Sequence, residues 1–319
     1  MRPVQVLCAA LCLSLAAAAG CGGPTDGNTD TAADLAEDPA RSATPAAPAY
    51  TVWDTAPHPE SVTIDGGVVY VTHFGDALEP STQDGDGYVA RYDANGTLVD
   101  TFATGLDAPK GSLVLGKTYY VADVDSLLGF STRDGSRVQA FSFTGETEYL
   151  NGLAAGPNNE LFASATDAGK IWRVEPASGK ITPFAELVGA NGLAYDAAAG
   201  ALYAVAFDQS DPSAGHVYRY DLGDPEPRKV SDYGGMLDGV AVVDGGAGLV
   251  FTDWNAAGGG TGRVVYLDVA NGQTAILAED ALFSGPADFD VMGDGLAMIP
   301  MLTGGRVVAV RLERPAAAE

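Results

Sequence analysis

Four oxygen-bearing side chains recur at matching places in the sequence and could together bind a metal ion. They are Glu60, Asn151, Asn191 and Asp238, and each stands at the start of a β-strand pattern. Carboxylate and amide oxygens are the ligands that Ca²⁺ prefers, with Mg²⁺, Mn²⁺ or Zn²⁺ as alternatives. The set therefore predicts a divalent-cation site, provided that the fold brings the four side chains together.

Two of the four residues belong to Asn-Gly pairs, which are also the strongest short signal for a hairpin turn. Asn95-Gly96 and Asn271-Gly272 lie between two strand patterns, and we interpret both as ordinary turns. Asn151-Gly152 and Asn191-Gly192 differ, because each of them opens a repeated unit. Turn chemistry alone is the alternative to a metal site.

An internal repeat supplies the elements that would position these residues. Its copies are spaced by 50, 41, 40, 47 and 50 residues, and each contains two strand patterns around a turn and then a third strand pattern. Repeats of this length are typical of four-stranded propeller blades. The sequence therefore predicts an all-β fold, a six-bladed β-propeller over residues 49–319. We call the residues that open the units the anchor residues: Glu60, Lys110, Asn151, Asn191, Asp238 and Asp288 of the Ala287-Asp288 pair.

The two ends of the repeat region predict how the ring closes. The last unit stops after its third strand, and residues 50–56, YTVWDTA, form an extra strand before the first unit. We expect this N-terminal strand to complete the sixth blade, because closure removes open sheet edges. The first strand of a propeller blade lines the central tunnel, so the anchor residues should face one another.

The N-terminal segment is typical of an exported protein. Arg2 precedes an apolar run that ends at Gly20-Cys21 and is short for a membrane-spanning helix. The pattern resembles the bacterial lipoprotein signal, which implies removal of residues 1–20 and lipidation of Cys21; a secreted protein cut nearby is the alternative. Residues 21–48 contain too few apolar side chains to fold and are predicted to be a disordered tether.

Composition limits the chemistry and the partners. All three cysteines lie at or before Cys21, so no disulfide, thiolate metal site or cysteine nucleophile is expected in residues 49–319. The formal net charge of −25 disfavours nucleic acid and favours cations. We therefore expect an extracytoplasmic lipoprotein of the bacterial cell envelope, anchored to a membrane by its lipid, with no nucleic-acid partner and with a monomer as the default for a closed propeller.

The order Glu, Asn, Asn, Asp resembles the senescence marker protein (regucalcin) and gluconolactonase family. The matching motifs are PESV around Glu60, NGLA at Asn151 and Asn191, and LDGVAV around Asp238. The pattern is also similar to diisopropylfluorophosphatases and strictosidine-synthase-like propellers, and it spans residues 50–312. The resemblance implies that the four residues are ligands to a divalent cation and that Asp238 is the base or nucleophile. Ser61-Val62 stands where lactonases usually have Gly-Pro, so the floor of the pocket should differ.

Further side chains are candidates for the substrate pocket, and the anchor residue Asp288 is one of them. Lys110 could form a salt bridge with Glu60 or Asp288, bind an anionic substrate, or point outward. His73 ends a second strand and could carry protons, although a lone histidine is more often structural. Asp253 and Trp254 end another second strand and could line the entrance.

Two functions fit this sequence. The first is a metal-dependent hydrolase of a lactone or related ester, in which Asp238 and the cation act together. The alternative is a non-catalytic propeller lipoprotein that holds a structural Ca²⁺ and binds a protein, peptide or carbohydrate. The fold does not decide between them, because propellers host many unrelated functions.

Overall fold

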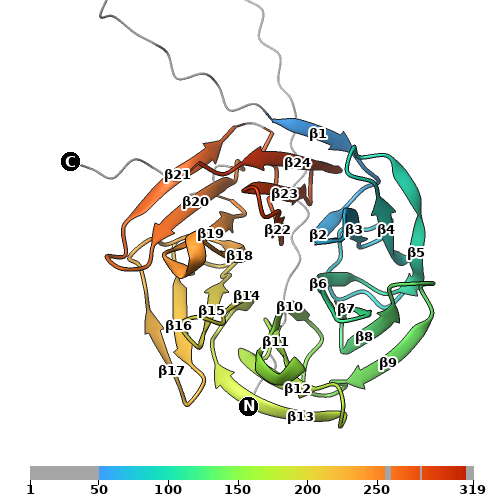
Figure 1. Cartoon of the computed structure of the whole chain (residues 1–319), viewed down its shortest axis with the longest axis horizontal. Helices are drawn as coiled ribbons and strands as arrows, with labels where there is room; N and C mark the ends of the chain where they lie inside the picture. The colour runs from blue at the N-terminus through green and yellow to red at the C-terminus, as the bar shows by residue number, and fades with distance from the viewer. Residues whose placement is uncertain (1–49, 256–259, 281, 314–319) are drawn as a thin grey trace, which may run out of the picture. The chain divides into compact units, whose positions relative to one another are not determined.

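The computed structural model describes residues 50–255, 260–280 and 282–313. The strands of this part form six antiparallel sheets of four strands each, and the sheets stand as blades around a common axis (Figure 1). The predicted six-bladed propeller is confirmed. The predicted signal segment, Cys21 and the tether lie outside the described residues and stay predictions. No helix in the described ranges is long and apolar enough to cross a membrane.

The first three blades follow one another along the chain, and each begins with its innermost strand. Blade 1 contains β2 (Pro59–Asp65), β3 (Val68–His73), β4 (Gly87–Tyr92) and β5 (Leu98–Leu106). Blade 2 contains β6 (Pro109–Leu115), β7 (Thr118–Asp123), β8 (Ser126–Ser131) and β9 (Arg137–Ser142). Blade 3 contains β10 (Leu150–Ala155), β11 (Leu161–Ala165), β12 (Lys170–Glu175) and β13 (Lys180–Glu186), with the short 3₁₀ turn η1 (Pro157–Asn159).

The remaining blades repeat this order, except that the outer strand of the last blade comes from the N-terminal end of the domain. Blade 4 contains β14 (Ala190–Asp196), β15 (Ala201–Ala206), β16 (Val217–Asp221) and β17 (Asp224–Lys229). Blade 5 contains β18 (Leu237–Val243), η2 (Asp244–Gly246), β19 (Gly248–Asp253), β20 (Arg263–Asp268) and β21 (Thr274–Glu279). Blade 6 contains β22 (Asp290–Val291), β23 (Leu296–Met301), β24 (Arg306–Arg311) and β1 (Thr51–Asp54).

The N-terminal strand closes the ring as the sequence predicts. β1 pairs antiparallel with β24, in a register that runs from Thr51 opposite Ala309 to Asp54 opposite Arg306. Blade 6 thus joins the two ends of the domain, and the closure leaves no blade short of its outer strand.

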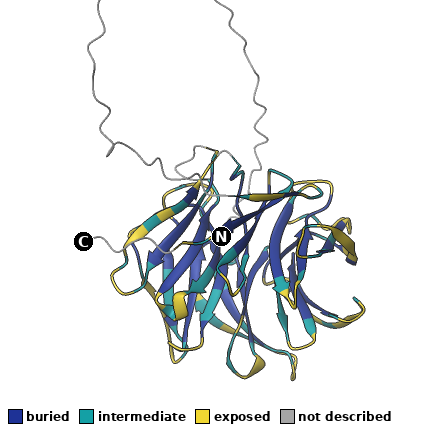
Figure 2. Cartoon of the chain, turned by 45° about the horizontal axis from the view of Figure 1, so that its top comes forward, coloured by how far each residue is buried: buried dark blue, intermediate teal, exposed yellow. Residues whose placement is uncertain are grey.

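The hydrophobic core is divided among the gaps between neighbouring blades. Six clusters of described residues each fill one gap, and each draws its side chains from two consecutive blades. Between blades 1 and 2, for example, the Tyr70 and Tyr119 rings stack with their centroids 4.8 Å apart. Figure 2 shows the result, with buried inner strands and exposed outer strands. The second strand of each blade is buried along almost its whole length, which explains its largely apolar and β-branched sequence.

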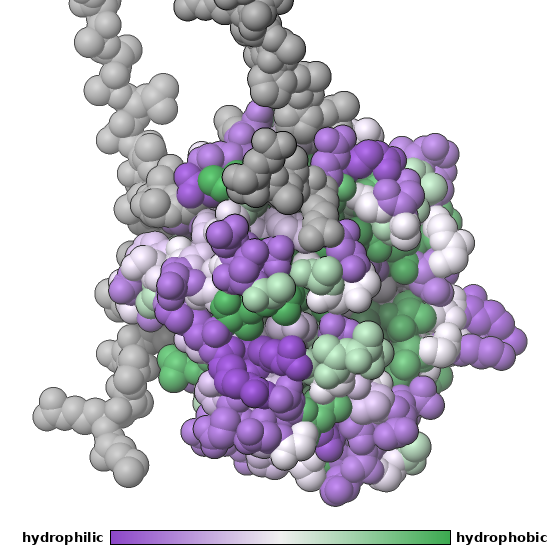
Figure 3. All heavy atoms as spheres, turned by 60° about the vertical axis from the view of Figure 1, so that its left-hand side comes forward, coloured by the Kyte–Doolittle hydropathy of each residue, from purple (hydrophilic) through white to green (hydrophobic). Residues whose placement is uncertain are grey.

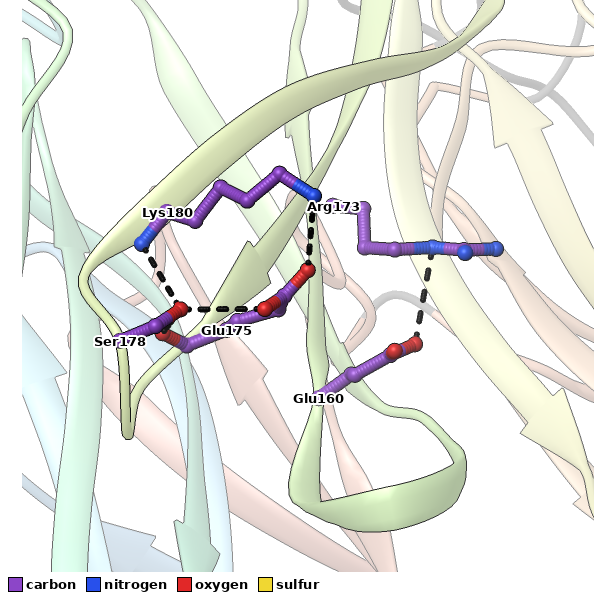
Figure 4. Close-up of polar contacts among 5 residues, drawn as sticks. All are labelled: Glu160, Arg173, Glu175, Ser178 and Lys180. Atoms are coloured by element: carbon purple, nitrogen blue, oxygen red, sulfur yellow. Dashed lines mark hydrogen bonds and ion pairs between the residues drawn. The ribbon is translucent and has the colours of Figure 1, made fainter.

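The outer strands carry the solvent-facing residues. β17 is exposed along its whole length and contains two prolines, Pro225 and Pro227, which protect an open sheet edge. The face in Figure 3 is mainly hydrophilic with small apolar patches. The close-up in Figure 4 shows typical surface contacts, such as Glu175 with Lys180 at 3.2 Å. Each exposed pair of this kind contributes at most about 1 kcal/mol.

Candidate metal centre

The anchor residues occupy equivalent positions in the blades. Five of them are the second residue of an innermost strand, in β2, β6, β10, β14 and β18, and Asp288 lies two residues before β22. These innermost strands surround the axis in Figure 1. The five strand residues are at most 6% exposed. The fold thus gathers the predicted ligands at one end of the axis, which we call the anchor face.

A β-bulge orients the side chain of each of the five anchor residues that lie in strands. In each of the five strands the pairing with the second strand shifts register at the anchor residue and the residue after it. In three blades a hydroxyl on the second strand accepts the freed N–H: Thr72 from Ser61, Ser164 from Gly152 and Thr252 from Gly239, each at 2.8 Å. Bulges commonly redirect side chains beside functional sites, and here the same bulge recurs around the ring.

The glycine after four of the anchor residues is required by close packing between blades. A Cβ atom on Gly152 would lie 2.5 Å from the carbonyl oxygen of Asn191, and one on Gly192 would lie 2.3 Å from that of Asp238. Gly111 and Gly239 are equally crowded by the next blade. Asn151-Gly152 and Asn191-Gly192 therefore belong to strands. Asn95-Gly96 and Asn271-Gly272 form the predicted turns, with positive φ at both glycines.

Four unpartnered oxygen atoms mark the centre of this arrangement. They are Glu60 Oε2, Asn151 Oδ1, Asn191 Oδ1 and Asp238 Oδ1, all buried and without a hydrogen-bond partner in the structure. The Asn151 amide is held by a 3.0 Å hydrogen bond from Nδ2 to Thr166, which leaves its oxygen free. Buried polar atoms are normally paired, because leaving one unpaired costs about 1–3 kcal/mol. The donor set therefore fits a hard cation.

The amide oxygens are essential to such a site. Among the described residues, no three His, Cys, Asp or Glu side chains lie close enough to form a metal-binding group by themselves. A cation at the anchor face would therefore need the oxygens of Asn151 and Asn191 as well as the carboxylates.

The carboxylates of the ring repel one another in a dry environment. Burial raises the pKa of Glu60 well above its ordinary value, and Asp238 and Asp288 raise it further. Burial also raises the pKa of Asp238, with a further contribution from Asp288. Asp238 thus acts on the Glu60 carboxyl although the two residues belong to the non-adjacent blades 5 and 1. Nearby positive charge would favour the ionised forms of these groups.

Asp288 joins the first and last blades. Its carboxylate accepts a 2.8 Å hydrogen bond from Ser61 Oγ, and the backbones of the two residues form a parallel bridge. Burial raises the pKa of Asp288 to about 7 despite this hydrogen bond. Ser61 thus ties blade 1 to blade 6 through both its side chain and its backbone.

Lys110 is a buried cation in the ring. Its Nζ donates a 2.8 Å hydrogen bond to the Ala108 carbonyl and lies over the rings of Phe74 and Tyr149, at 5.4 and 4.9 Å from their centroids. Burial lowers its pKa to about 8, although the Glu60 carboxylate opposes that shift. The outward orientation, one of three alternatives from the sequence, is wrong, because the side chain is fully buried. No salt bridge within 4.0 Å joins it to a described carboxylate.

His73 is fully buried at the end of β3. Its ring stacks on Tyr88, and Nδ1 lies 3.0 Å from the Pro57 carbonyl. Burial lowers its pKa to about 4, so the imidazole is neutral near pH 7. The contact with Pro57 fastens the loop that leads into Glu60, which favours the structural reading of His73.

Asp253 and Trp254 follow one another at the end of β19. Asp253 accepts hydrogen bonds from the Tyr233 hydroxyl at 2.8 Å and from the Met236 N–H at 3.2 Å, so both of its oxygens hold the preceding loop in place. Trp254 is half-buried and meets the Phe207 ring edge-on at 6.1 Å. Trp254 therefore remains a candidate to line the pocket entrance. Asp253 is the weaker candidate, because both of its oxygens are already hydrogen-bonded.

Two cavities in the described part of the protein lie away from the anchor residues. One of about 420 Å³ lies between blades 5 and 6, and one of about 250 Å³ lies between blades 6 and 1. Met292 lines both cavities, and neither is lined by an anchor residue. The inner strand of blade 6 is only two residues long, which leaves space on both of its sides.

Comparison with known proteins gives matches in fold but not in sequence. No protein-family model and no curated protein matches the chain. A gluconolactonase from Xanthomonas campestris has a TM-score of 0.65 at 15% identity, covering 86% of this chain and 99% of its own. A Bacteroides thetaiotaomicron protein of unknown function has a TM-score of 0.62 at 15% identity, with 83% and 76% covered. Virginiamycin B lyase from Staphylococcus aureus has a TM-score of 0.56 at 15% identity, with 83% and 99% covered. The shared feature is the propeller fold.

The sequence did not reveal several residues that shape this site. The Ser61–Asp288 hydrogen bond links the first and last blades, which are far apart in the chain. The hydroxyls of Thr72, Ser164 and Thr252 bind the innermost strand of their own blade. A signal for the hydroxyls was present, because they occupy the same position in the second strands of blades 1, 3 and 5.

Proposed function

We propose that Glu60, Asn151, Asn191 and Asp238 bind a divalent cation, Ca²⁺ in the first place, and that the protein hydrolyses a lactone or related ester at this site. The observation that supports the proposal is the set of four buried, unpartnered oxygen atoms, one from each of these side chains. Such an arrangement is costly unless a ligand completes it.

The residues would divide the chemistry among themselves. A bound divalent cation would polarise the ester carbonyl and stabilise the developing oxyanion. Glu60, Asn151 and Asn191 would hold the cation, and Asp238 would both hold it and serve as the base or nucleophile. Ser61, through its 2.8 Å hydrogen bond, would keep the Asp288 carboxylate at the edge of the ring. Closely packed innermost strands would fix these positions before substrate binds.

Metal binding is the first thing to test. Calorimetric titration of Ca²⁺ into the chelator-treated protein should show binding that Glu60→Gln abolishes, because the substitution removes a carboxylate charge and keeps the shape of the side chain. Glu226→Gln is a matched control, because Glu226 lies in the fully exposed strand β17. Equal Ca²⁺ binding by wild type and Glu60→Gln would refute the site.

Activity is tested separately with a panel of lactones and esters. Asp238→Asn should abolish turnover with the fold intact, and Asn191→Ala should weaken Ca²⁺ binding. Asn95→Ala changes an exposed turn residue and should alter neither property. Survival of activity in Asp238→Asn would remove Asp238 from the mechanism.

The second candidate is a non-catalytic propeller in which the same ring holds a structural Ca²⁺. The strong burial of the ring favours it, because Glu60, Asn151, Asn191 and Asp238 are only 3–6% exposed. In that case Ca²⁺ would bind and raise the melting temperature, while no lactone or ester would be hydrolysed. A protein, peptide or carbohydrate would then be the partner.

The cellular location belongs to the proposal as well. We infer from the N-terminal sequence that Cys21 carries a lipid and holds the protein at a membrane of the bacterial envelope. Incorporation of labelled palmitate into the wild type, and its loss in Cys21→Ser, would test this. Equal labelling of both would place the lipid elsewhere.

A further inference from the structure

A second ring of side chains lies directly beyond the anchor residues. It consists of the residue that follows the second strand of each blade, and we call it the collar: Phe74, Val124, Thr166, Phe207, Trp254 and Leu302. Five of its six members are apolar, whereas every anchor residue is charged or an amide. The side chains therefore change from polar in the anchor ring to mainly apolar in the collar, the ring next to it.

Strand register places the collar at the anchor face. The residue just before an anchor residue pairs with the last residue of the second strand, as in Pro59 with His73 and Leu237 with Asp253. The collar residue is the next one along, so it lies one step past the anchor residues, beyond the end of the paired strands. The ammonium of Lys110, itself an anchor residue, lies 5.4 Å from the centroid of the Phe74 ring. The two rings are therefore in contact.

The collar residues also contact one another across blades. Phe74, Val124 and Leu302 form one buried cluster with Ala108 and Ala287, and Trp254 packs against it. The Phe207 ring extends the cluster through its edge-on contact with Trp254 at 6.1 Å. Five blades thus contribute to a continuous apolar cluster beside the candidate metal centre, and the half-buried Phe207 and Trp254 are its accessible part.

The one polar member of the collar is already engaged. Thr166 Oγ1 accepts a hydrogen bond from Asn151 Nδ2 at 3.0 Å and donates one to the Ala190 carbonyl at 2.7 Å. The Trp254 indole N–H is the collar's only other side-chain donor. Phe207 and Trp254 are half-buried, so their rings retain surface that a ligand can cover. A ligand rich in hydroxyl groups would lose hydrogen bonds to water here and find few in return.

We propose that the collar selects substrates whose lactone or ester group carries an alkyl chain or aromatic ring, and disfavours the polyhydroxylated ring of a sugar lactone. This inference rests on the proposed function, because it places the reacting group at the anchor residues and the apolar substituent against Phe207 and Trp254. It assigns to the collar a role in specificity and none in the bond-breaking step.

The test uses a series of neutral lactones with the Ca²⁺-loaded protein. From γ-butyrolactone to γ-decalactone, kcat/KM should rise by about two- to fourfold for each methylene that contacts the collar, because burial of a methylene is worth up to about 0.8 kcal/mol. Glucono-δ-lactone should be the poorest substrate. A flat series, or a preference for glucono-δ-lactone, would overturn the inference.

Binding of the same lactones, followed by tryptophan fluorescence, separates the two proposals. If no lactone is hydrolysed but affinity still rises with chain length, the hydrolase proposal fails and the collar is supported. If affinity is independent of chain length, the collar proposal fails whether or not the protein is a hydrolase.

Variants place the effect on the collar. Phe207→Gln should reduce the increment per methylene by at least about half, and Phe207→Leu should restore most of it, because leucine returns the apolar surface. Val138→Gln is the control, since Val138 is 52% exposed on the outer strand β9 and should leave the series unchanged. An unaltered increment in Phe207→Gln would remove Phe207 from the specificity surface.

Discussion

Replacement of Asp288 by asparagine should make the metal-free protein more stable at alkaline pH. Burial raises the pKa of this carboxyl from its ordinary 3.8 to about 7. The folded protein therefore retains a proton that the unfolded chain releases. Stability from this group is complete below pH 3.8 and is lost as the pH rises through 7. An amide has no such proton to lose and still accepts the hydrogen bond from Ser61.

The magnitude follows from the size of the pKa difference. Each unit of pH between the two values changes the free energy of unfolding by about 1.4 kcal/mol. Over the whole interval the wild type should lose about 4 kcal/mol relative to the variant. Glu60 and Asp238 would lose an unfavourable neighbour as well, because Asp288 raises the pKa of both. The variant should therefore gain at least a few kcal/mol at pH 8 and almost nothing at pH 4.

The assay is urea denaturation of both proteins in chelator at pH 4, 6 and 8. The difference in the free energy of unfolding should grow with pH, and added Ca²⁺ should reduce it by stabilising the ionised wild type. A difference that is constant from pH 4 to pH 8 would refute the reasoning, because it would mean that Asp288 titrates alike in the folded and unfolded states.

Three further outcomes are expected. Burial lowers the pKa of His73 from 6.5 to about 4, so its imidazole stays neutral in the folded protein. The free energy of unfolding should therefore fall by about 1.4 kcal/mol per pH unit as the pH drops from 6.5 towards 4. In acid denaturation curves, His73→Gln should weaken this pH dependence. Gly152→Ala should cost about 1–3 kcal/mol in urea denaturation, because its Cβ would lie 2.5 Å from the Asn191 carbonyl, whereas Gly223→Ala, with open space around it, should cost little. Lys110→Met should tighten Ca²⁺ binding on the order of tenfold in calorimetry, because it removes a buried positive charge beside the candidate site.

The repeat made the propeller predictable, because each blade contains a similar pattern of strands and turns. The sixth unit lacked a strand and an extra strand preceded the first unit, so the sequence predicted that this extra strand completes the sixth blade. The pairing of β1 with β24 confirms it. Equivalent positions in a repeat become equivalent positions around an axis. The location of Glu60, Asn151, Asn191 and Asp238 at one end of that axis could therefore be inferred from spacing alone.

The environment of individual side chains could not be inferred in the same way. The sequence left three alternatives for Lys110. The structure shows that its ammonium group contacts the Ala108 carbonyl and the rings of Phe74 and Tyr149. Asn-Gly pairs are ambiguous in a sequence, because a turn needs glycine for positive φ, whereas Gly152 and Gly192 are needed for close approach of the next blade. These distinctions depend on long-range packing, which spacing along the chain does not specify.

The charges of the ring give the strongest physical reason to expect a cation there. Glu60, Asp238 and Asp288 would carry three negative charges when ionised, and Lys110 supplies one positive charge. Such an excess is costly in a buried environment. Burial is the main cause of the raised pKa of all three carboxyls, and repulsion by other ring carboxylates adds to it for Glu60 and Asp238. A divalent cation would bring the sum to zero, and a monovalent ion would not. Under the proposed function, Lys110 thus sets the charge of the ion that the site accepts. Asn151 and Asn191 add oxygen ligands without adding charge.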